Sequence, residues 1–365
     1  MRIRSIELKG YRREFVTPLV TARITIAYRT GFLIRVTGDN CHAGYGEVGT
    51  PLEIEPFLQP SDDDTLDLVR DELSKQFVGK MIPHTPGDVK NLISTYFSDA
   101  PEYIRFGVEI ALADLASRTA QKPLCRWLRA KSRPSIPVNY LVNRPVEDWD
   151  SLRSAIVQPW YRAVKAKVGM ESVDDDVRFV TRLRQELGEG ISIRLDANQA
   201  WTFDAAQDAL QRVRDMQIEY IEEPLEKPDA DALKRLHEAA GVGIALDESV
   251  KCLWDARRAL EDAVCDAVIV KPAAMGGIDP TIEILRYGQK LGRKVVVTSS
   301  LETEIGIAAH LHLAASIPGE IPPYGLDTLR LYRDADPALT RVVDGAIAVP
   351  SGPGLGIGDD LWEKL

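Results

Sequence analysis

Short apolar runs alternate with helical stretches through the second half of the chain. The runs cover residues 161–168, 191–196, 217–222, 243–248 and 266–271, and they are rich in Ile, Val and Ala. Such runs are typical of strands that are buried on both faces of a parallel sheet. Strands that alternate with helices at this spacing predict a (β/α) barrel, in which the carboxyl ends of the strands meet at one rim.

The first 130 residues have a different pattern. A run at 3–8 predicts one strand, and two further runs at 24–28 and 32–37 predict a hairpin that turns at Thr30-Gly31. Because these strands precede helices, we expect a separate small α+β domain. Its helical stretches are expected at residues 65–77, 85–97 and 101–119.

The barrel is expected to begin after the break at Arg133-Pro134-Ser135. Its first strand is predicted at 136–142, and later strands are predicted at 294–299 and, more weakly, near 324–327. The turn-rich tail that closes the chain is expected to return towards the first domain. The predicted units are therefore 1–130, 131–330 and 331–365.

Composition narrows the possible functions. The chain has 365 residues, 45% of them hydrophobic, which is enough for a barrel and a smaller unit. The net charge of −10 and the lack of a basic run argue against a nucleic-acid partner. No apolar stretch reaches the length of a membrane span or signal core, so a cytoplasmic protein without a membrane partner is expected. The four cysteines show no CxxC spacing and are expected to be reduced.

Three of the five apolar runs end in carboxylates, at Asp196, Glu222 and Asp247. A single acid at such a position could be a solvated strand end or a helix cap, but three in register at one rim predict a metal site. Oxygen-only ligands suit a hard cation such as Mg²⁺ and leave part of its coordination shell open for substrate. Glu223 and Glu248 are alternative ligands, although side-chain alternation along a strand favours Glu222 and Asp247.

The other two runs end near lysines. Lys165 and Lys167 are two residues apart, so both side chains are expected on the inner side of one strand. Lys165 is then the cationic neighbour that favours the free amine of Lys167. Lys271 ends a strand farther round the barrel and is expected across the rim from Lys167. A cation flanked by lysines suits proton abstraction next to a carboxylate through an enediolate.

In order along the chain, the motifs VKAKVG, RLDANQAW, YIEEPL, ALDES and VIVKPAAMGGI resemble those of the enolase superfamily, in its muconate-lactonizing-enzyme subgroup. The resemblance spans essentially the whole chain. It implies an α/β protein with a (β/α)7β TIM-like barrel and an N-terminal α+β capping domain that is completed by the C-terminal tail.

The resemblance also implies roles for individual residues. Lys167 corresponds to the base and Lys271 to the second lysine, with Lys165 beside them. Asn198, Ser299 and Ser300 correspond to substrate-binding positions, and residues 15–25 correspond to a mobile specificity loop. Asp196, Glu222 and Asp247 correspond to the Mg²⁺ ligands, with Mn²⁺ as a substitute. The implied partner is a small carboxylate substrate, and a homo-oligomer is a further expectation.

Within the subgroup, the segments TSSLETEIG and PPYGLDT most resemble those of the o-succinylbenzoate synthases of menaquinone biosynthesis. These lyases dehydrate 2-succinyl-6-hydroxy-2,4-cyclohexadiene-1-carboxylate. Dipeptide epimerases carry an Asp-x-Asp pair that holds a substrate ammonium, whereas this chain has Gly325-Leu326-Asp327. N-acylamino acid racemase, dipeptide epimerase and muconate cycloisomerase remain alternatives, as does a non-catalytic dicarboxylate-binding protein.

Overall fold

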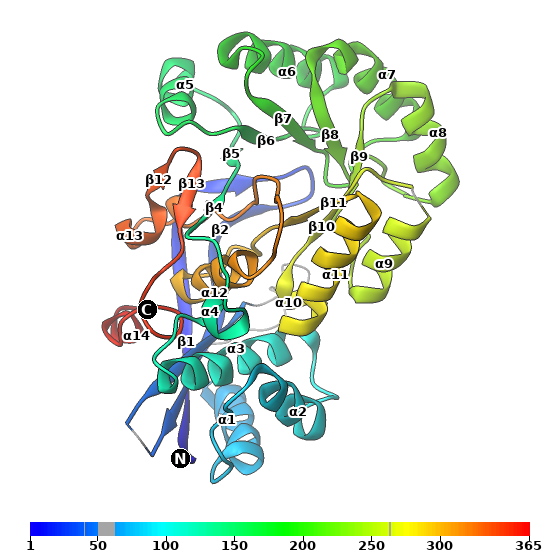
Figure 1. Cartoon of the computed structure of the whole chain (residues 1–365). Helices are drawn as coiled ribbons and strands as arrows, with labels where there is room; N and C mark the ends of the chain where they lie inside the picture. Colours follow the sequence, from blue (N-terminus) through cyan, green and yellow to red (C-terminus); the bar gives the residue numbers. More distant parts are fainter. Residues whose placement is uncertain (40, 50–62, 263) are drawn as a thin grey trace.

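The computed structural model describes residues 1–39, 41–49, 63–262 and 264–365, and it consists of a sheet-and-helix unit beside a curled barrel (Figure 1). In the first unit, the antiparallel strands β1 (Ile3–Val20), β2 (Thr25–Gly38) and β3 (Ala43–Gly49) form one sheet in the order β1-β2-β3. The helices of this unit are α1 (Asp63–Phe77), α2 (Pro86–Tyr96), α3 (Glu102–Thr119) and α4 (Leu124–Leu128).

Glycines bring α3 unusually close to β3. A Cβ atom on Gly46 would lie 2.0 Å from the carbonyl oxygen of Gly107, and one on Gly44 would lie 2.3 Å from Ala111 O. Only residues without a side chain permit this separation. The close contact fixes β3 on a helix that is buried along most of its length.

The predicted hairpin within residues 24–37 is wrong, because β2 is one continuous strand. Gly31 pairs with Tyr11 on one side and with Gly49 on the other. A Cβ atom at Gly31 would lie 2.5 Å from Val48 O, so this glycine allows close strand packing rather than a turn. The hairpin tip instead joins β1 to β2, within the segment predicted to be the specificity loop.

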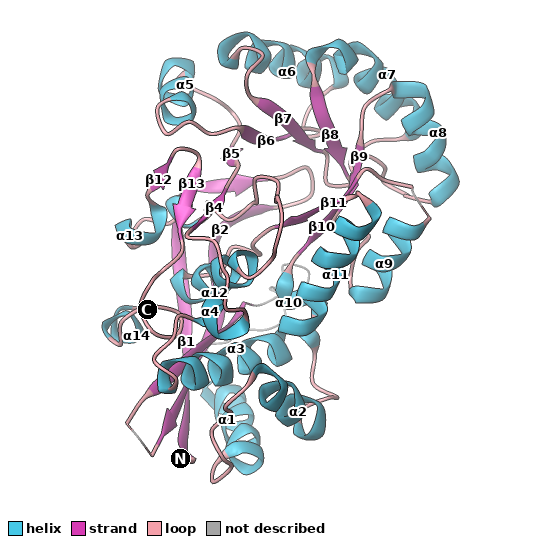
Figure 2. Cartoon of the chain, viewed as in Figure 1, coloured by secondary structure: helices cyan, strands magenta, loops and turns pink. Residues whose placement is uncertain are grey.

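The second unit is a seven-stranded parallel sheet in the order β11-β10-β9-β8-β7-β6-β5. The strands of the sheet are curled into a barrel wall with helices packed on its outer side (Figure 2). They are β5 (Tyr140–Val142), β6 (Ala163–Lys167), β7 (Ser192–Asp196), β8 (Ile218–Glu222), β9 (Ile244–Leu246), β10 (Ala267–Val270) and β11 (Lys294–Val297).

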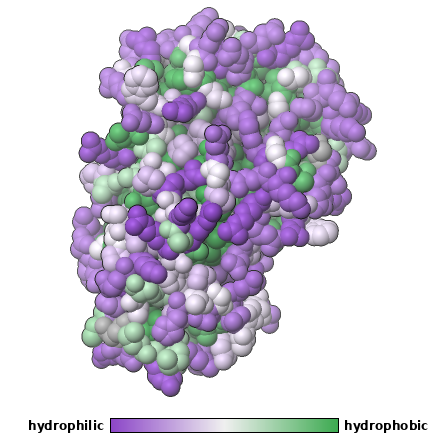
Figure 3. All heavy atoms as spheres, viewed as in Figure 1, coloured by the Kyte–Doolittle hydropathy of each residue, from purple (hydrophilic) through white to green (hydrophobic). Residues whose placement is uncertain are grey.

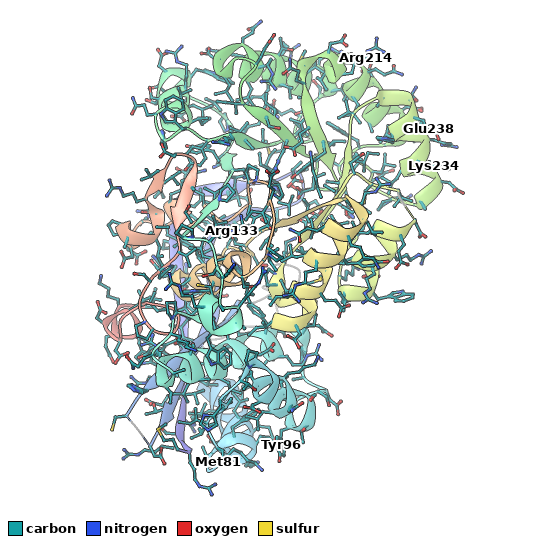
Figure 4. The ribbon with its side chains drawn as sticks, in the orientation of Figure 1. Met81, Tyr96, Arg133, Arg214, Lys234 and Glu238 are labelled. Carbon is teal, nitrogen blue, oxygen red and sulfur yellow. The ribbon has the colours of Figure 1, made fainter. Side chains whose placement is uncertain are left out.

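The helices of the barrel begin at well-defined caps. The side chains of Ser172, Thr202 and Asp229 each accept a hydrogen bond from a backbone N–H in the first turn of α6, α7 and α8. On α8, Leu233 and Leu236 are buried, whereas Lys234 and Glu238 point outward (Figure 4). The helices are α5 (Trp149–Val157), α6 (Val173–Leu187), α7 (Phe203–Val213), α8 (Ala230–Ala240), α9 (Leu253–Glu261), α10 (Pro272–Met275), α11 (Ile278–Leu291) and α12 (Glu304–Ala315).

The gap between β11 and β5 is closed by isolated bridges at the place where the weak last strand is predicted, near 324–327. Gly325 bridges Thr298, and Tyr324 bridges Val138. The strand predicted at 136–142 is also divided, since β4 (Ser135–Pro137) leaves the barrel to pair with β13 (Ala346–Ala348). The predicted α/β fold, a (β/α)7β TIM-like barrel with a cap, is confirmed at the level of architecture.

The C-terminal tail contacts both units. It contains α13 (Pro337–Thr340), β12 (Val342–Val343), β13 and α14 (Asp360–Lys364). The hairpin β12-β13 pairs with β4, whereas the Trp362 ring lies 5.9 Å from the Tyr45 ring of β3. The face shown in Figure 3 is mainly hydrophilic with small apolar patches. No helix in the described part of the chain is long and apolar enough to cross a bilayer.

Candidate active site

The charged residues predicted to meet at one rim lie at the carboxyl ends of adjacent strands. Lys167, Asp196 and Glu222 are the last residues of β6, β7 and β8, and they pair with one another in register. Asp247 directly follows β9, and Lys271 directly follows β10. The barrel therefore brings all five positions to the same rim, as the spacing predicts.

Two lysines on β6 reach the carboxylates of the neighbouring strands. Lys167 Nζ donates hydrogen bonds to Asp196 Oδ2 at 2.7 Å and to Asn198 Oδ1 at 2.9 Å. Lys165 Nζ lies 2.8 Å from Asp196 Oδ2 and 2.6 Å from Glu222 Oε1. Lys165 and Lys167 thus point to the same side of the strand, as predicted.

The third lysine enters from the other edge of the rim. Lys271 Nζ pairs with Asp247 Oδ1. Lys167 at the end of β6 pairs with Asp196, and Lys271 after β10 pairs with Asp247, so the two lysines approach from opposite sides of β8 in the sheet order. A substrate between them has an amino group on each side.

Burial and neighbouring charges shift the pKa values of the site carboxyls in opposite directions. Burial opposes ionisation of Asp196, but Lys165 and Lys167 outweigh it and hold its pKa below the ordinary value. Burial, reinforced by the negative charge of Asp196, raises the pKa of Glu222 well above the ordinary value. Such divergent shifts in one cluster are typical of functional sites.

The pKa values of two lysines in the site are raised by neighbouring carboxylates. Burial disfavours the ammonium of Lys165, but Asp196 and Glu222 reverse the effect and hold its pKa well above the ordinary value. For Lys271, Asp247 likewise outweighs burial and raises the pKa. Both lysines are therefore cationic in this arrangement.

The two alternative ligands have different environments. Glu223 accepts hydrogen bonds from Asp247 N at 2.9 Å, Ser249 N at 2.7 Å and Gln199 Nε2 at 2.9 Å. Its oxygens are thus engaged in holding the loop that carries Asp247. Glu248 Oε1 accepts a hydrogen bond from Asn198 Nδ2 at 2.7 Å, while its Oε2 has no partner among the described residues.

In this arrangement, no three His, Cys, Asp or Glu side chains among the described residues come close enough to enclose an ion, because lysine ammoniums lie between the carboxylates. The donor set nevertheless fits a hard divalent cation. All the converging ligands are carboxylate oxygens, and the buried Glu222 Oε2 has no hydrogen-bond partner within the described chain. A buried acceptor without a donor is costly unless something else completes it.

A cavity of about 450 Å³ opens beside these charges. Lys165, Lys167, Asn198, Asp247 and Lys271 line its floor. Ser299 and Ser300, the predicted substrate-binding residues in the loop after β11, lie on the wall of the cavity. Leu301 and Thr328 line the same wall. Ser299 Oγ lies 2.7 Å from Thr328 Oγ1.

Several lining residues were not predicted from the sequence. The end of β1, the turn that follows and the start of β2 contribute Leu19, Thr21, Arg23, Ile24 and Ile26, and the barrel wall contributes Asn139, Leu141 and Asp327. The tip lies within the predicted specificity loop, but its individual residues carry no local signal. Arg330, three residues after Asp327, is the signal that could have identified a paired acid at that position.

Asp327 is held by a cation and a phenol. Its Oδ2 accepts hydrogen bonds from Tyr161 Oη at 2.6 Å and from Arg330 Nε at 2.8 Å. Its Oδ1 is buried. Burial raises the pKa of Asp327, and Arg330 only partly opposes this. The wall that Asp327 lines therefore presents a carboxylate whose charge is balanced by Arg330 but whose Oδ1 still lacks a donor among the described residues.

This architecture, a capped barrel with three carboxylates and two opposed lysines at its rim, has known relatives. The model for enolase C-terminal domain-like proteins matches residues 149–363. A D-Ala-D/L-Ala epimerase of Cytophaga hutchinsonii is 28% identical over 98% of this chain and 96% of its own length. A chloromuconate cycloisomerase of Pseudomonas putida is 29% identical over 69% of this chain and 69% of its own.

A solved structure extends the match to three dimensions. The dipeptide epimerase from Cytophaga hutchinsonii, complexed with Mg and the dipeptide D-Ala-L-Val, has a TM-score of 0.83 and 25% identity, covering 100% of this chain and 98% of that chain. The chain belongs to the enolase superfamily, in the subgroup that includes muconate-lactonizing enzymes and dipeptide epimerases. The predicted family is therefore confirmed.

Proposed function

We propose that this enzyme abstracts the proton next to a substrate carboxylate, with Lys167 as the base and Mg²⁺ held by Asp196, Glu222 and Asp247. The observation that carries the proposal is that Lys167 and Lys271 reach the same cavity from different strands and pair with different members of the carboxylate triad. A related epimerase structure contains Mg.

When bound, Mg²⁺ supplies positive charge for the substrate carboxylate and so favours the enediolate over the ground state. Lys167, in its free amine form, takes the proton from the α-carbon. Asn198, which accepts from Lys167 Nζ at 2.9 Å, orients the amine. Lys271, cationic beside Asp247, faces the developing negative charge from the other side and either stabilises it or returns a proton.

The distal part of the cavity favours a substrate without a positive charge there. Among the described lining residues of this wall, Asp327 is the one acid, and Arg330 already neutralises it. Arg23 at the hairpin tip is exposed and adds a cation to the lining. An anionic or neutral tail therefore fits better than an ammonium, because a cation would meet no free counter-charge.

For the substrate, we propose 2-succinyl-6-hydroxy-2,4-cyclohexadiene-1-carboxylate, so that the enzyme is an o-succinylbenzoate synthase. One carboxylate of this substrate suits the rim, and the other suits the hairpin tip with its cationic Arg23. The TSSLETEIG and GLDT segments support the same substrate. One lysine suffices, since Lys167 can take the proton and return it to the departing hydroxide on the same face. Lys271 then needs only to remain a cation.

A second candidate is racemisation of an N-acylamino acid or epimerisation of a dipeptide. The full-length similarity to a D-Ala-D/L-Ala epimerase favours it, as does the placement of Lys271 on a strand distant from Lys167. In this reaction Lys271 must give and take a proton. The neutral Asp327–Arg330 pair favours the N-acyl substrate over the dipeptide.

The test compares the candidate substrates in parallel assays. Purified enzyme with Mg²⁺ is assayed for o-succinylbenzoate formation and, in deuterium oxide, for α-proton exchange into N-succinylamino acids, L-Ala-L-Glu and muconolactone. Dehydration with kcat/KM of roughly 10⁴ M⁻¹s⁻¹ or more supports the synthase. Efficient exchange without dehydration supports the second candidate. A complete lack of proton transfer with every substrate would overturn the proposed function.

A further inference from the structure

One buried carboxylate outside the site joins the capping sheet to the barrel. Glu47 of β3 is 5% exposed. Its oxygens accept hydrogen bonds from Thr303 N at 2.9 Å, Thr303 Oγ1 at 2.6 Å and Gly306 N at 2.9 Å. All of these donors lie at the start of α12 in the barrel, so a side chain of one unit caps a helix of the other.

The same carboxylate is also tied to the capping hairpin. Tyr11 Oη of β1 donates a hydrogen bond of 2.6 Å to Glu47 Oε1. Strand β1 continues to Val20, and the hairpin that follows contributes Thr21 and Arg23 to the cavity lining. The backbone amides of Thr303 and Gly306 can only donate, which matches Glu47 as the acceptor in these bonds, while burial and the nearby charge of Glu302 raise the pKa of Glu47.

The helix that Glu47 caps directly follows the serine loop, residues 299–302, on the cavity wall. Within this loop, Ser300 N donates to Glu302 Oε2 at 2.7 Å, and Leu301 O accepts from Tyr332 Oη at 2.6 Å. Leu301 has φ of 65°, a left-handed conformation that a leucine rarely adopts. Such a conformation persists only where the surroundings hold it in place.

Glu47 therefore lies where the two walls of the cavity meet. Its bond to Tyr11 fixes the strand that leads to the hairpin tip, and its bonds to Thr303 and Gly306 fix the end of the serine loop. Gly306 leaves the space that the Glu47 carboxylate occupies at the helix, because a Cβ atom at this position would lie 2.9 Å from Glu47 Oε2 and 2.4 Å from Glu302 Cβ.

We propose that Glu47 is a positioning residue that sets the serine loop against the capping hairpin, so that substrate binds between walls held at a fixed separation. The inference rests on the proposed function for its kinetic readout. Because Lys167 and the carboxylate triad are anchored on strands β6 to β9, Glu47 acts on substrate binding and not on proton abstraction.

The test compares Glu47→Gln with a matched control. Glutamine keeps the size of the side chain but places an amide NH₂ where an acceptor is needed for the α12 amides. Glu109→Gln is the control, because Glu109 of the capping unit is also buried and also accepts from a barrel helix, at Ile278 N. Glu109 does not line the cavity.

For Glu47→Gln we expect KM to rise at least about 10-fold with kcat within about 3-fold, while the control leaves both unchanged. Thr303→Val removes one donor to Glu47 without removing the carboxylate, and it should raise KM by about 3-fold. Unchanged KM in both Glu47→Gln and Thr303→Val would overturn the proposal. It would also be overturned if kcat fell in proportion to the amount of folded enzyme lost.

Hydrogen exchange provides a readout that does not need a substrate. Peptides that cover residues 299–306 should exchange faster in Glu47→Gln than in the wild type, whereas peptides from β6 and β7 should be unchanged. Unchanged exchange at 299–306 would overturn the positioning role. If the wild type turned over none of the candidate substrates, the proposed function would fail, while this exchange measurement would still decide the role of Glu47.

Discussion

Strand β7 carries buried charge at two levels of the barrel, and the two levels differ in how well the charge is satisfied. At the lower level, the fully buried Arg194 donates to Glu219 Oε2 at 2.8 Å, to Asn139 Oδ1 at 3.2 Å and to Pro323 O at 2.6 Å. Glu219 also accepts from Lys294 Nζ at 2.8 Å. Burial would raise the pKa of Glu219, but Arg194 outweighs it and lowers the pKa to about 2.

Two residues farther along β7, at Asp196, the charges are not satisfied in this way. Glu222 Oε2 and Glu248 Oε2 are buried without partners among the described residues. The pKa of Asp196 is lowered while that of Glu222 is raised. Burial of charge alone therefore does not mark a site. A balanced network stabilises the barrel, whereas an incomplete one has capacity left for an ion and a substrate.

The largest effect is expected when the proposed base is removed. Lys167→Ala should lower kcat/KM by about 10⁴-fold, because a positioned general base contributes up to about this factor. Proton abstraction is measured as deuterium uptake from solvent. Lys234→Ala, on the outer face of α8, is the control and should behave as the wild type (Figure 4). Undiminished exchange in Lys167→Ala would mean that Lys167 is not the base.

The next largest effect is expected from the carboxylate triad. Asp196→Asn, Glu222→Gln and Asp247→Asn should each lower kcat/KM by about 10³-fold, or roughly 4 kcal/mol, and weaken Mg²⁺ binding in calorimetry. Chelation should abolish activity, and Mg²⁺ should restore it.

Glu223→Gln sharpens the ligand assignment. Because Glu223 holds backbone amides of the next loop, we expect a loss of only about 10-fold. If Glu223→Gln abolished Mg²⁺ binding while Glu222→Gln retained it, the two glutamates would have to exchange roles.

Much of this site could be predicted because its information is local. Each of Lys167, Asp196 and Glu222 ends an apolar run, so the position of the strand also gives the position of the charged group. Gly31 shows the limit of local reasoning. A glycine between two apolar runs indicates a turn in sequence, but here it allows close approach to Val48 across the sheet.

Other features depend on contacts between residues far apart in the chain. Glu47 meets Thr303, and Tyr161 meets Asp327, only after the barrel has closed and the cap has docked. Lys165 shows a related difficulty. The sequence placed it beside Lys167, but not between Asp196 and Glu222, because that position depends on the register of three strands. Substrate identity has no local pattern and could not be predicted in the same way.

A further prediction tests the balanced end of β7. Arg194→Met should lower the free energy of unfolding by about 3 kcal/mol, since it breaks the pair at its buried end and leaves the partly buried Glu219 without its main partner. Lys294→Met is the matched control, and because Lys294 is half exposed the loss should be below about 1 kcal/mol. Urea denaturation measures both. A stable Arg194→Met enzyme that had lost Mg²⁺ binding would show that this network belongs to the site.

The last prediction concerns a buried acid that has a perturbed pKa but no site around it. Burial raises the pKa of Glu109 to about 7, and the charge of Asp279 adds to the effect while Arg105 and Lys90 oppose it. In the unfolded chain the same group titrates near pH 4.3. Between about pH 4.3 and 7 the folded state therefore binds more protons than the unfolded state, so stability falls as the pH rises through this window.

Glu109→Gln should remove this part of the pH dependence, because glutamine can still accept the hydrogen bond from Ile278 N and never ionises. Urea denaturation at pH 5 and pH 8 should show the wild type losing up to about 3 kcal/mol more than the variant between the two values. Parallel losses in the two proteins would mean that Glu109 titrates normally. With the difference observed and kcat and KM unchanged, Glu109 would show that a displaced pKa identifies a site only when unsatisfied ligands and a cavity accompany it.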